Sequence, residues 1–398
     1  MNSSNRIKQI VRTLGFIGAA VSAAPALATQ GTFPHGYGVK SEGMGGVGIA
    51  LPQDAVAGAT NPAGMVEVGT RADIGMALLQ VDNGAYFGGT NYDGGSEKDL
   101  YLIPQLGVNY MIDTETSIGL SVVGNGVGTA HDKVNVGGMQ RPKSEYKQMV
   151  STVSLARRIT PNQRVGVGLV LAYQRLALHG PGSLGLPQGH DSSFGYGLSL
   201  GWQGKVLPNL TLGATYASKI DMGRMDKFDK LLADDGDLDA PEHYGIGAAL
   251  NLGATTLAAD VMRILWSDVK SLGNPGVAIA TGAPGDKDGP GFGWRDQTVW
   301  RFGVAHQFNE QLTLRAGYNQ GNQILDSAST YLGIVAPSAN RKHWTLGATY
   351  QIDPAMELSV AYARSPKERV KGDGPGPNGS TDLYMGQDWL SLSLGMRF

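Results

Sequence analysis

The chain contains no cysteine among its 398 residues. This absence excludes disulfide bridges, thiol chemistry and thiolate metal ligands. The seven histidines are scattered and form no H-x-H or H-E-x-x-H pair. The sequence therefore predicts no zinc site and no other metal centre.

Charge is also scarce. Charged residues make up 17% of the chain, whereas soluble domains average roughly 25%. Three of the 32 basic residues lie in the N-terminal segment described next, and without them 29 basic residues face 34 acidic ones, a formal charge of −5. A nucleic-acid partner requires a basic surface, so no nucleic-acid binding is expected.

The first 28 residues have the organisation of a secretory signal peptide. Arg6, Lys8 and Arg12 form a basic start, and residues 13–24 are small or apolar. The sequence Ala-Leu-Ala at 26–28 matches the small-x-small pattern of a cleavage site, so we expect cleavage after Ala28. The apolar run of about 12 residues is too short for the ~20 residues of a membrane-spanning helix.

No later apolar run reaches that length, but alternation of apolar with small or polar residues recurs. In the final segment every second residue from Leu390 to Phe398 is large and apolar, while serine, glycine and arginine occupy the other face. This pattern is typical of a transmembrane β-strand with lipid outside and a polar lumen inside. Phe398 is expected to face lipid at the end of the last strand.

Segments of this kind follow one another through the chain, about 14 in all, an even number as in single-chain outer-membrane barrels. Short turns and long polar or glycine-rich connections alternate between them, which a soluble β-sandwich or propeller does not predict. The sequence thus predicts an all-β fold, an antiparallel transmembrane β-barrel over residues 70–398 with both termini in the periplasm. Strands are expected to begin near residues 70, 100, 116, 146, 165, 191, 209, 242, 255, 296, 312, 342, 356 and 388, and long connections are expected at 82–99, 125–145, 179–190, 220–241, 267–295, 320–341 and 365–387.

Residues 29–69 lack strand alternation and are rich in glycine. A segment of this kind ahead of the barrel wall is expected to fill the lumen as a plug, or hatch. Its Gly43-Met44-Gly45-Gly46-Val47-Gly48 stretch matches the dinucleotide fingerprint G-x-G-x-x-G, but no strand precedes it and Pro52 would interrupt the following helix. We therefore expect a packed glycine-rich turn and no cofactor.

A second motif, G-x-S-x-G, surrounds Ser199. In hydrolases this motif forms a strained strand-to-helix turn, whereas here it lies within an alternating strand. The chain is therefore not expected to be an enzyme, and an outer-membrane hydrolase remains the weaker alternative.

The connection at 220–241 carries an apolar stripe. Its members are spaced by three and four residues, which predicts one apolar face of a helix over residues 220–232. Because a loop has no core of its own, this face is expected either to pack on another loop or to contact an apolar ligand, for which methionine is well suited. The stripe consists of Met222, Met225, Phe228, Leu231 and Leu232.

An acidic run follows at residues 234–239, where Asp234, Asp235, Asp237 and Asp239 stand together. Its spacing departs from that of an EF-hand loop. We interpret the run as a solvated loop surface, with loose Ca²⁺ bridging to lipopolysaccharide phosphates as the alternative.

The end of the third strand is rich in glycine, at Gly124, Asn125, Gly126 and Gly128. Glycine weakens a β-ladder and permits bulges. The segment is either the start of a loop or a gap in the barrel wall.

The hatch resembles that of the FadL/TodX family, outer-membrane transporters of long-chain fatty acids and hydrocarbons. The resemblance rests on the glycine-rich stretch from Ser41 to Ala50, the Asp54-Ala55 pair and the Asn-Pro-Ala-Gly sequence at 61–64, with further matches at Pro104 and residues 314–318. It implies that outer loops capture apolar ligands, which pass to a site inside the barrel and leave sideways through a gap at a kinked third strand once the hatch shifts. Carried onto this chain, it assigns gating to Asn61, Pro62, Ala63, Gly64, Gly43, Gly45 and Gly46, the lateral gap to Gly124, Asn125, Gly126 and Gly128, and ligand capture to Met222, Met225, Phe228, Leu231 and Leu232.

The leading prediction is passive uptake of hydrophobic small molecules by a monomer that contacts outer-membrane lipid and lipopolysaccharide. The alternatives are a general diffusion porin for polar solutes and the hydrolase mentioned above. Arg301 and Arg315 alternate with apolar neighbours and are expected to face the lumen. There each either binds a fatty-acid carboxylate or forms an internal salt bridge.

Overall fold

The computed structural model describes residues 30–92, 99–131 and 133–398, so the predicted signal peptide lies outside the described residues. One sheet contains sixteen strands, of which β2 (Thr90–Asn91) and β9 (Asp221–Met222) are short additions to its edge. The remaining strands close into a barrel, because β16 pairs with β1 from Arg71↔Arg397 to Phe87↔Thr381. This confirms the predicted antiparallel barrel of 14 strands. No helix of the described residues is long and apolar enough to cross a membrane.

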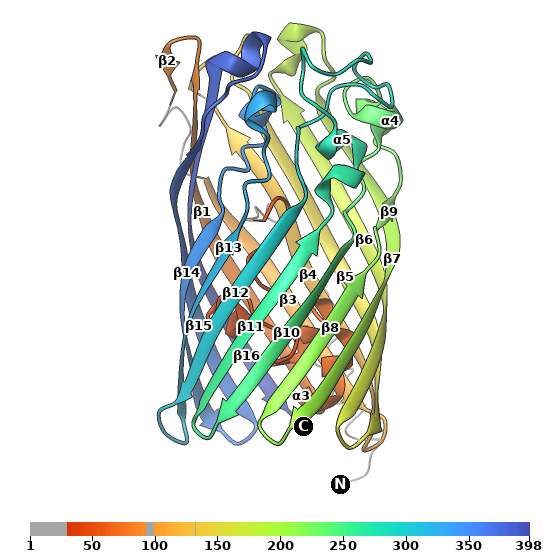
Figure 1. Cartoon of the computed structure of the whole chain (residues 1–398), viewed down its shortest axis with the longest axis vertical. Coiled ribbons are helices and arrows are strands. Elements are labelled where there is room, and N and C mark those ends of the chain that lie inside the picture. The colour runs from red at the N-terminus through yellow and green to blue at the C-terminus, as the bar shows by residue number, and fades with distance from the viewer. Residues whose placement is uncertain (1–29, 93–98, 132) are drawn as a thin grey trace.

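The barrel strands pair with their neighbours along the chain (Figure 1). The short turns lie at one end, together with the C-terminus, and the long connections form a crown at the other end. The strands are β1 Arg71–Phe87, β3 Asp99–Met111, β4 Thr116–Ala130, β5 Lys143–Thr160, β6 Gln163–His179, β7 Gly189–Leu207, β8 Leu210–Ala217, β10 His243–Leu252, β11 Thr255–Ile264, β12 Gln297–Gln307, β13 Leu312–Gly321, β14 Lys342–Asp353, β15 Met356–Val370 and β16 Thr381–Arg397.

Alternation along the strands places large apolar side chains outside. Leu392 is 46% exposed on the outer face of β16, while the adjacent Ser391 is 1% exposed on the inner face. Phe398 is 58% exposed at the end of the same strand. The outer face is therefore apolar and suited to lipid, and the inner face is small or polar.

Several strands extend further toward the crown than expected. β16 begins at Thr381 instead of near residue 388. β4 continues as far as Ala130 and so takes up the first residues of the connection predicted at 125–145. The reason is an inversion of polarity above the lipid-facing band. There Leu383 and Met385 point inward and are 0% and 1% exposed, because they belong to the apolar cluster beneath the crown, so the outward-apolar alternation is lost.

Short helices and turns make up the crown. They include η3 Pro181–Leu184, η4 Asp226–Phe228, α4 Ala233–Gly236, η5 Trp266–Asp268, α5 Lys270–Gly273, η6 Ser327–Ser329, η7 Leu332–Ile334 and η8 Gly376–Ser380. The segment α4 is not regular, because Asp234 and Asp235 have φ values of 54° and 55°.

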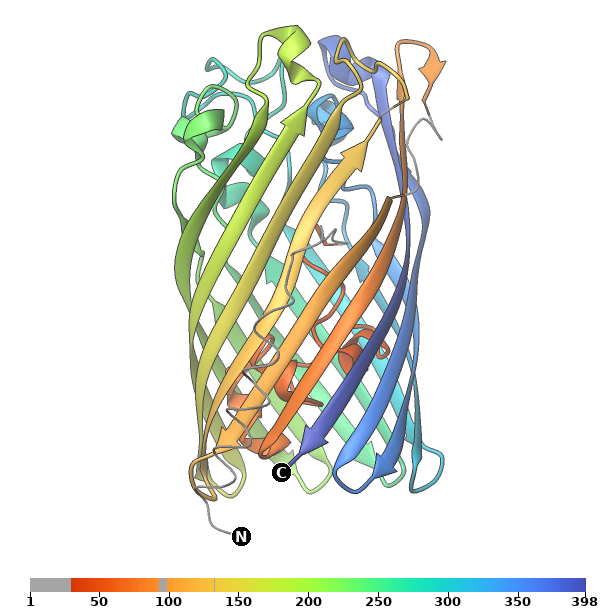
Figure 2. The ribbon, with the colours of Figure 1, turned by 180° about the vertical axis from the view of Figure 1, so that it is seen from behind.

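Residues 30–69 lie inside the barrel, in its lower half in Figure 2. Their elements are α2 Val39–Glu42, η1 Ala55–Ala59, η2 Pro62–Gly64 and α3 Met65–Val68. Glycine permits very close packing here. A Cβ at Gly45 (φ +73°) would lie 2.5 Å from the Phe302 carbonyl oxygen, and a Cβ at Gly43 would lie 2.8 Å from the Gly347 Cα. The glycine-rich stretch therefore packs directly on the backbone of the wall.

Candidate functional site

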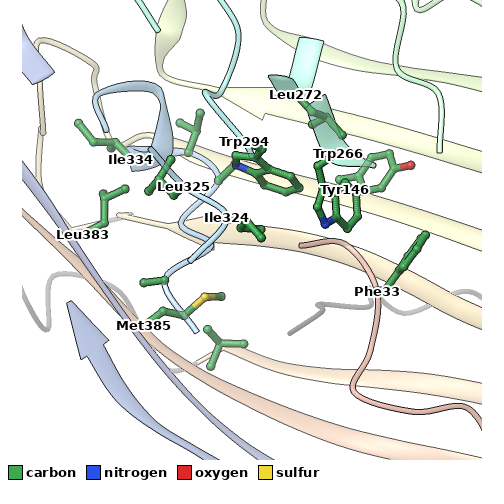
Figure 3. Packing of buried hydrophobic residues seen from close by; sticks show 14 of the residues in the cluster. Phe33, Tyr146, Trp266, Leu272, Trp294, Ile324, Leu325, Ile334, Leu383 and Met385 are labelled. Atoms are coloured by element: carbon green, nitrogen blue, oxygen red, sulfur yellow. The ribbon is translucent and has the colours of Figure 1, made fainter. Parts of the chain in front are cut away.

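A large apolar cluster fills the lumen beneath the crown (Figure 3). Trp266 and Trp294 form its centre, with ring centroids 5.2 Å apart in an edge-to-face arrangement. Phe33 of the hatch packs on Trp266 at 5.1 Å and on His243 at 5.2 Å. Such contacts are typical of a stable aromatic core, and they join the start of the hatch to the crown.

Next to this cluster lies an apolar cavity of about 310 Å³, here called the outer cavity. The loops at 180–188, 218–242, 265–296 and 322–341 supply most of its wall. Strands β5 and β6, Met139, Pro377 and Thr32 of the hatch supply the rest. Leucine, proline and aromatic side chains dominate the lining, as expected of a site for an apolar ligand. Representative residues are Pro181, Leu184, Leu232, Leu272, Phe292 and Val335.

The five residues predicted to capture ligand are not on one helix. Residues 220–232 form the two-residue strand β9, the single turn η4 and irregular backbone, so the predicted helix is wrong. The reason is pairing with the wall, because β9 adds to β7 with Met222 opposite Gly195. The local spacing mimicked a helical face.

Those five residues also divide between two places. Leu231 and Leu232 line the outer cavity, and Met225 and Phe228 are fully buried in the same apolar cluster. Met222 belongs to a separate cluster around the smaller cavity described next.

A second cavity of about 40 Å³, the inner cavity, also contacts the first hatch residues. Phe33 and Tyr37 of the hatch line it, together with Val123 and Asn125 of β4. Thr32 lines the outer cavity and Phe33 lines the inner one. The turn at residues 30–33 therefore contacts both cavities.

The wall beside the inner cavity contains a break in the β-ladder. β3 and β4 pair only from Leu106↔Val122 to Met111↔Ser117. Beyond that point β4 pairs with β5 alone, as far as Ala130. The break lies between the orange strands in Figure 2, where the ribbons diverge.

The glycine-rich end of β4 follows this break directly, and the hatch occupies the unpaired edge. The Gly126 N–H donates to the Thr32 carbonyl oxygen at 2.9 Å. The Tyr37 hydroxyl donates to Asn125 Oδ1 at 2.7 Å. Gly124, Asn125, Gly126 and Gly128 all lie on β4 beyond its last pairing with β3, and β4 remains a regular partner of β5 there.

Asn61 fastens the middle of the hatch to the wall. Its Oδ1 accepts a hydrogen bond from the Ala63 N–H at 3.0 Å and so caps η2, which Pro62 begins. Its amide nitrogen donates to the Ile49 carbonyl oxygen at 2.7 Å and to the carbonyl oxygens of Trp202 and Ala214 at 3.2 Å each.

Glycines of the wall leave room for this contact. A Cβ at Gly201 would lie 1.9 Å from Asn61 Oδ1, and a Cβ at Gly166 would lie 2.4 Å from the Ala63 nitrogen. Gly64, the last residue of the motif, packs so closely on Pro52 that a Cβ would lie 2.7 Å from it.

Buried ion pairs fasten the hatch at a second place. Lys40 pairs with Glu357 of β15, which also pairs with Arg71 at 2.6 Å. Arg71 in turn contacts Asp73, whose Oδ2 accepts a hydrogen bond from the Ala55 N–H at 2.8 Å. Because breaking a buried pair leaves an uncompensated charge, this network strongly opposes displacement of residues 40–55.

The two arginines predicted as carboxylate partners face the lumen but do not line the outer cavity. Arg301 donates to the Gly46 carbonyl oxygen at 3.2 Å and to Gln30 Oε1 at 2.8 Å. Arg315 donates to Gln53 Oε1 at 3.1 Å and to Thr349 Oγ1 at 2.7 Å. Both are engaged with the hatch or with the wall beside it.

Within the described residues, the motif around Ser199 and the acidic run at 234–239 form no catalytic or metal-binding arrangement. Ser199 lies in the regular strand β7, and its hydroxyl makes no hydrogen bond within the described residues. The described residues also contain no group of three or more side chains suited to a metal ion, including the acidic run at 234–239.

The sequence reasoning missed most of the outer cavity. Phe292, Trp294 and Val335 come from connections interpreted as plain loops. Phe33, which lines the inner cavity, precedes the glycine-rich stretch of the hatch and was also missed. One signal was present, because Gly-Pro-Gly-Phe-Gly-Trp at 289–294 is unusually apolar for a solvent-exposed connection.

Comparison with known proteins places these features in context. The model of a family described as outer membrane protein transport protein (OMPP1/FadL/TodX) matches residues 22–376. The chain is similar to the P. putida toluene transporter TodX, with a TM-score of 0.72 and 19% identity over 92% of this chain and 99% of that one. No curated protein sequence matches the chain.

Two further structures have the same architecture. A Pseudomonas aeruginosa FadL homologue gives a TM-score of 0.69 at 18% identity, covering 94% of this chain and 100% of that one. The Ralstonia pickettii toluene transporter TbuX gives 0.66 at 17% identity, covering 92% and 99%. At these identities the likeness shows the shared fold.

Proposed function

The chain belongs to the outer membrane protein transport family (OMPP1/FadL/TodX), and on that premise we propose that it takes up hydrophobic small molecules passively across the bacterial outer membrane. The proposed route runs from the outer cavity, past the turn at residues 30–33, into the inner cavity and sideways through the wall between β3 and β4. The observation that carries this proposal is the position of that turn, which contacts both cavities and also bonds to the unpaired edge of β4.

The first step is capture in the outer cavity. A small aromatic hydrocarbon with roughly 150 Å² of apolar surface gains about 4 kcal/mol on leaving water for such a site. The cavity is already formed by side chains of the crown and wall. Because the site is formed in advance, little of that gain is lost to ordering the protein.

The second step requires the start of the hatch to move. Two hydrogen bonds hold residues 32 and 37 to β4, each contributing about 1 kcal/mol to stability. The rest of the hatch is held by Asn61 and by the buried ion pairs of Lys40 and Arg71. Residues 30–37 are also held by Arg301, which donates to Gln30, and by the packing of Phe33 on Trp266, but the described structure gives them no buried ion pair. The proposed moving part is therefore residues 30–37, while residues 38–69 stay in place.

The third step is lateral release. The inner cavity is lined by Val123 and Asn125 of β4, next to the point where β3 and β4 separate. An exit there delivers an apolar molecule into the lipid of the membrane. Release sideways avoids exposing it to water on the periplasmic side.

Obstruction of the inner cavity tests the route. Ala240 lines that cavity and is 3% exposed, so Ala240→Trp fills it. The matched control is Ala348→Trp on the outward-facing side of β14, opposite Leu314. Uptake of radiolabelled toluene and oleate by a deletion strain carrying each variant should fall at least tenfold for Ala240→Trp and stay unchanged for the control. Equal uptake by both variants would overturn the route, and a deletion strain unimpaired on both compounds would overturn the function.

A general diffusion porin is the competing function. It predicts an open polar pore, whereas hatch residues pack on the inner wall, as in the contact between Gly45 and the Phe302 carbonyl. Single-channel recording in planar bilayers separates the two functions. We expect no large stable conductance for small ions, and a steady open pore would favour the porin.

A further inference from the structure

The charged groups around the outer cavity are unusual for a site that takes fatty acids. Among the described residues that line it, Asp239 is the one carboxylate and there is no lysine, arginine or histidine. The Asp239 side chain is only 3% exposed. An apolar cavity thus contains a buried acid and no buried base.

Two contacts hold the Asp239 carboxylate in place. One oxygen accepts a hydrogen bond from the Met222 N–H at 2.7 Å, and the other pairs with Lys219. Lys219 is 47% exposed and does not line the cavity. A ligand carboxylate would have to compete with Asp239 for this cation and would do so beside a like charge.

Other cations that the sequence suggested for a carboxylate are already engaged elsewhere. Arg301 bonds to Gly46 and Gln30, and Arg315 bonds to Gln53 and Thr349. Burying a carboxylate without a partner is strongly unfavourable, whereas burying a neutral hydrocarbon or alcohol is not.

We infer that the outer cavity selects uncharged apolar molecules and rejects carboxylates, and that Asp239 is the residue that sets this selection. The inference rests on the proposed uptake function and specifies its substrate class. It makes the deprotonated fatty acid a poor ligand, and it makes neutral aromatic or aliphatic hydrocarbons and long-chain alcohols good ones.

The test compares two ligands of equal chain length, 1-dodecanol and dodecanoate, on the full-length mature protein in nanodiscs at pH 8. Each ligand displaces the fluorescent apolar probe 1-N-phenylnaphthylamine. For the wild-type protein, dodecanol should compete at least tenfold more strongly than dodecanoate. The preference should disappear for Asp239→Asn, because the like charge is gone and Lys219 loses the carboxylate that it pairs with directly.

Two further variants separate charge from folding. Asp239→Glu keeps the charge and should keep the preference for dodecanol. Asp229→Asn removes an exposed acid from the same connection and should leave both affinities unchanged.

The outcomes are distinct. Equal competition by the two ligands in the wild type, or an unchanged preference in Asp239→Asn, would overturn the selection by Asp239 while leaving uptake intact. If neither ligand displaces the probe, the uptake function and the inference fail together.

Discussion

Replacing Asn61 with alanine should loosen the hatch without unfolding the barrel. The change removes the acceptor that caps Ala63 and the donors to Ile49, Trp202 and Ala214. Loss of an N-cap side chain costs about 1 kcal/mol. Loss of the amide donors adds about 1–2 kcal/mol, because the Ile49 carbonyl keeps a hydrogen bond from Gln203 at 2.9 Å.

The expected destabilisation of the middle hatch is therefore about 2–3 kcal/mol, which corresponds to roughly 30- to 150-fold faster opening. Hydrogen exchange followed by mass spectrometry measures this directly on peptides covering residues 48–64. Peptides from the barrel strands should exchange as in the wild type, because their protection comes from interstrand pairing.

The matched control is Asn309→Ala. Like Asn61, Asn309 accepts backbone hydrogen bonds through its side chain, from Gln311 and Leu312, but it does so in an exposed turn. Asn309→Ala should leave hydrogen exchange in the hatch unchanged. If exchange at 48–64 does not accelerate in Asn61→Ala, or accelerates equally in Asn309→Ala, then Asn61 does not fasten the hatch.

Three further predictions concern other parts of the molecule. Glu357→Gln leaves Lys40 and Arg71 without their shared carboxylate. The hatch should therefore lose about 3–5 kcal/mol of stability and become sensitive to added protease, and protease resistance equal to that of the wild type would contradict this. Phe33→Ala removes a side chain of the turn that contacts both cavities, and uptake of labelled toluene by whole cells should rise; unchanged or lower uptake would show that Phe33 is no barrier. Burial and the neighbouring Asp239 raise the pKa of Asp237 to about 6. The connection at 218–242 should therefore gain stability as pH falls from about 6 toward 4, and its stability should be lowest above pH 6. Hydrogen exchange corrected for intrinsic rates should show this pH dependence in the wild type and not in Asp237→Asn.

The barrel was predictable because one local rule applies along each strand. A transmembrane strand between lipid and a polar lumen must alternate, so residues such as Leu390 and Ser391 reveal their faces without knowledge of any neighbour. The rule ends where the lipid ends. At Leu383 and Met385 the lumen is filled by the apolar cluster beneath the crown, so apolar residues turn inward and the start of β16 was placed too late.

The hatch was predictable as a plug, but its fastening was not. Glycine richness indicated close packing, and Asn61-Pro62 indicated a capped turn. The wall residues that contact Asn61 and Pro62, such as Gly201, depend on contacts between segments far apart in the chain. The helix expected over residues 220–232 was wrong for a related reason, since pairing of Met222 with β7 overrode the local periodicity.

The sequence by itself determined the class of the protein: an exported, cysteine-free chain whose alternating segments close a barrel around a glycine-rich plug. These properties depend on residue type and on periods of two along the chain, which need no partner to be recognised. Only the tertiary structure decided where a ligand fits. The outer cavity brings together residues from six connections, from two strands and from the hatch, and the break beside Val122 exists because β3 and β4 diverge. It also decided that Asp239 lines the cavity while Arg301 and Arg315 do not, since the direction of a side chain in a crown or lumen depends on everything packed around it.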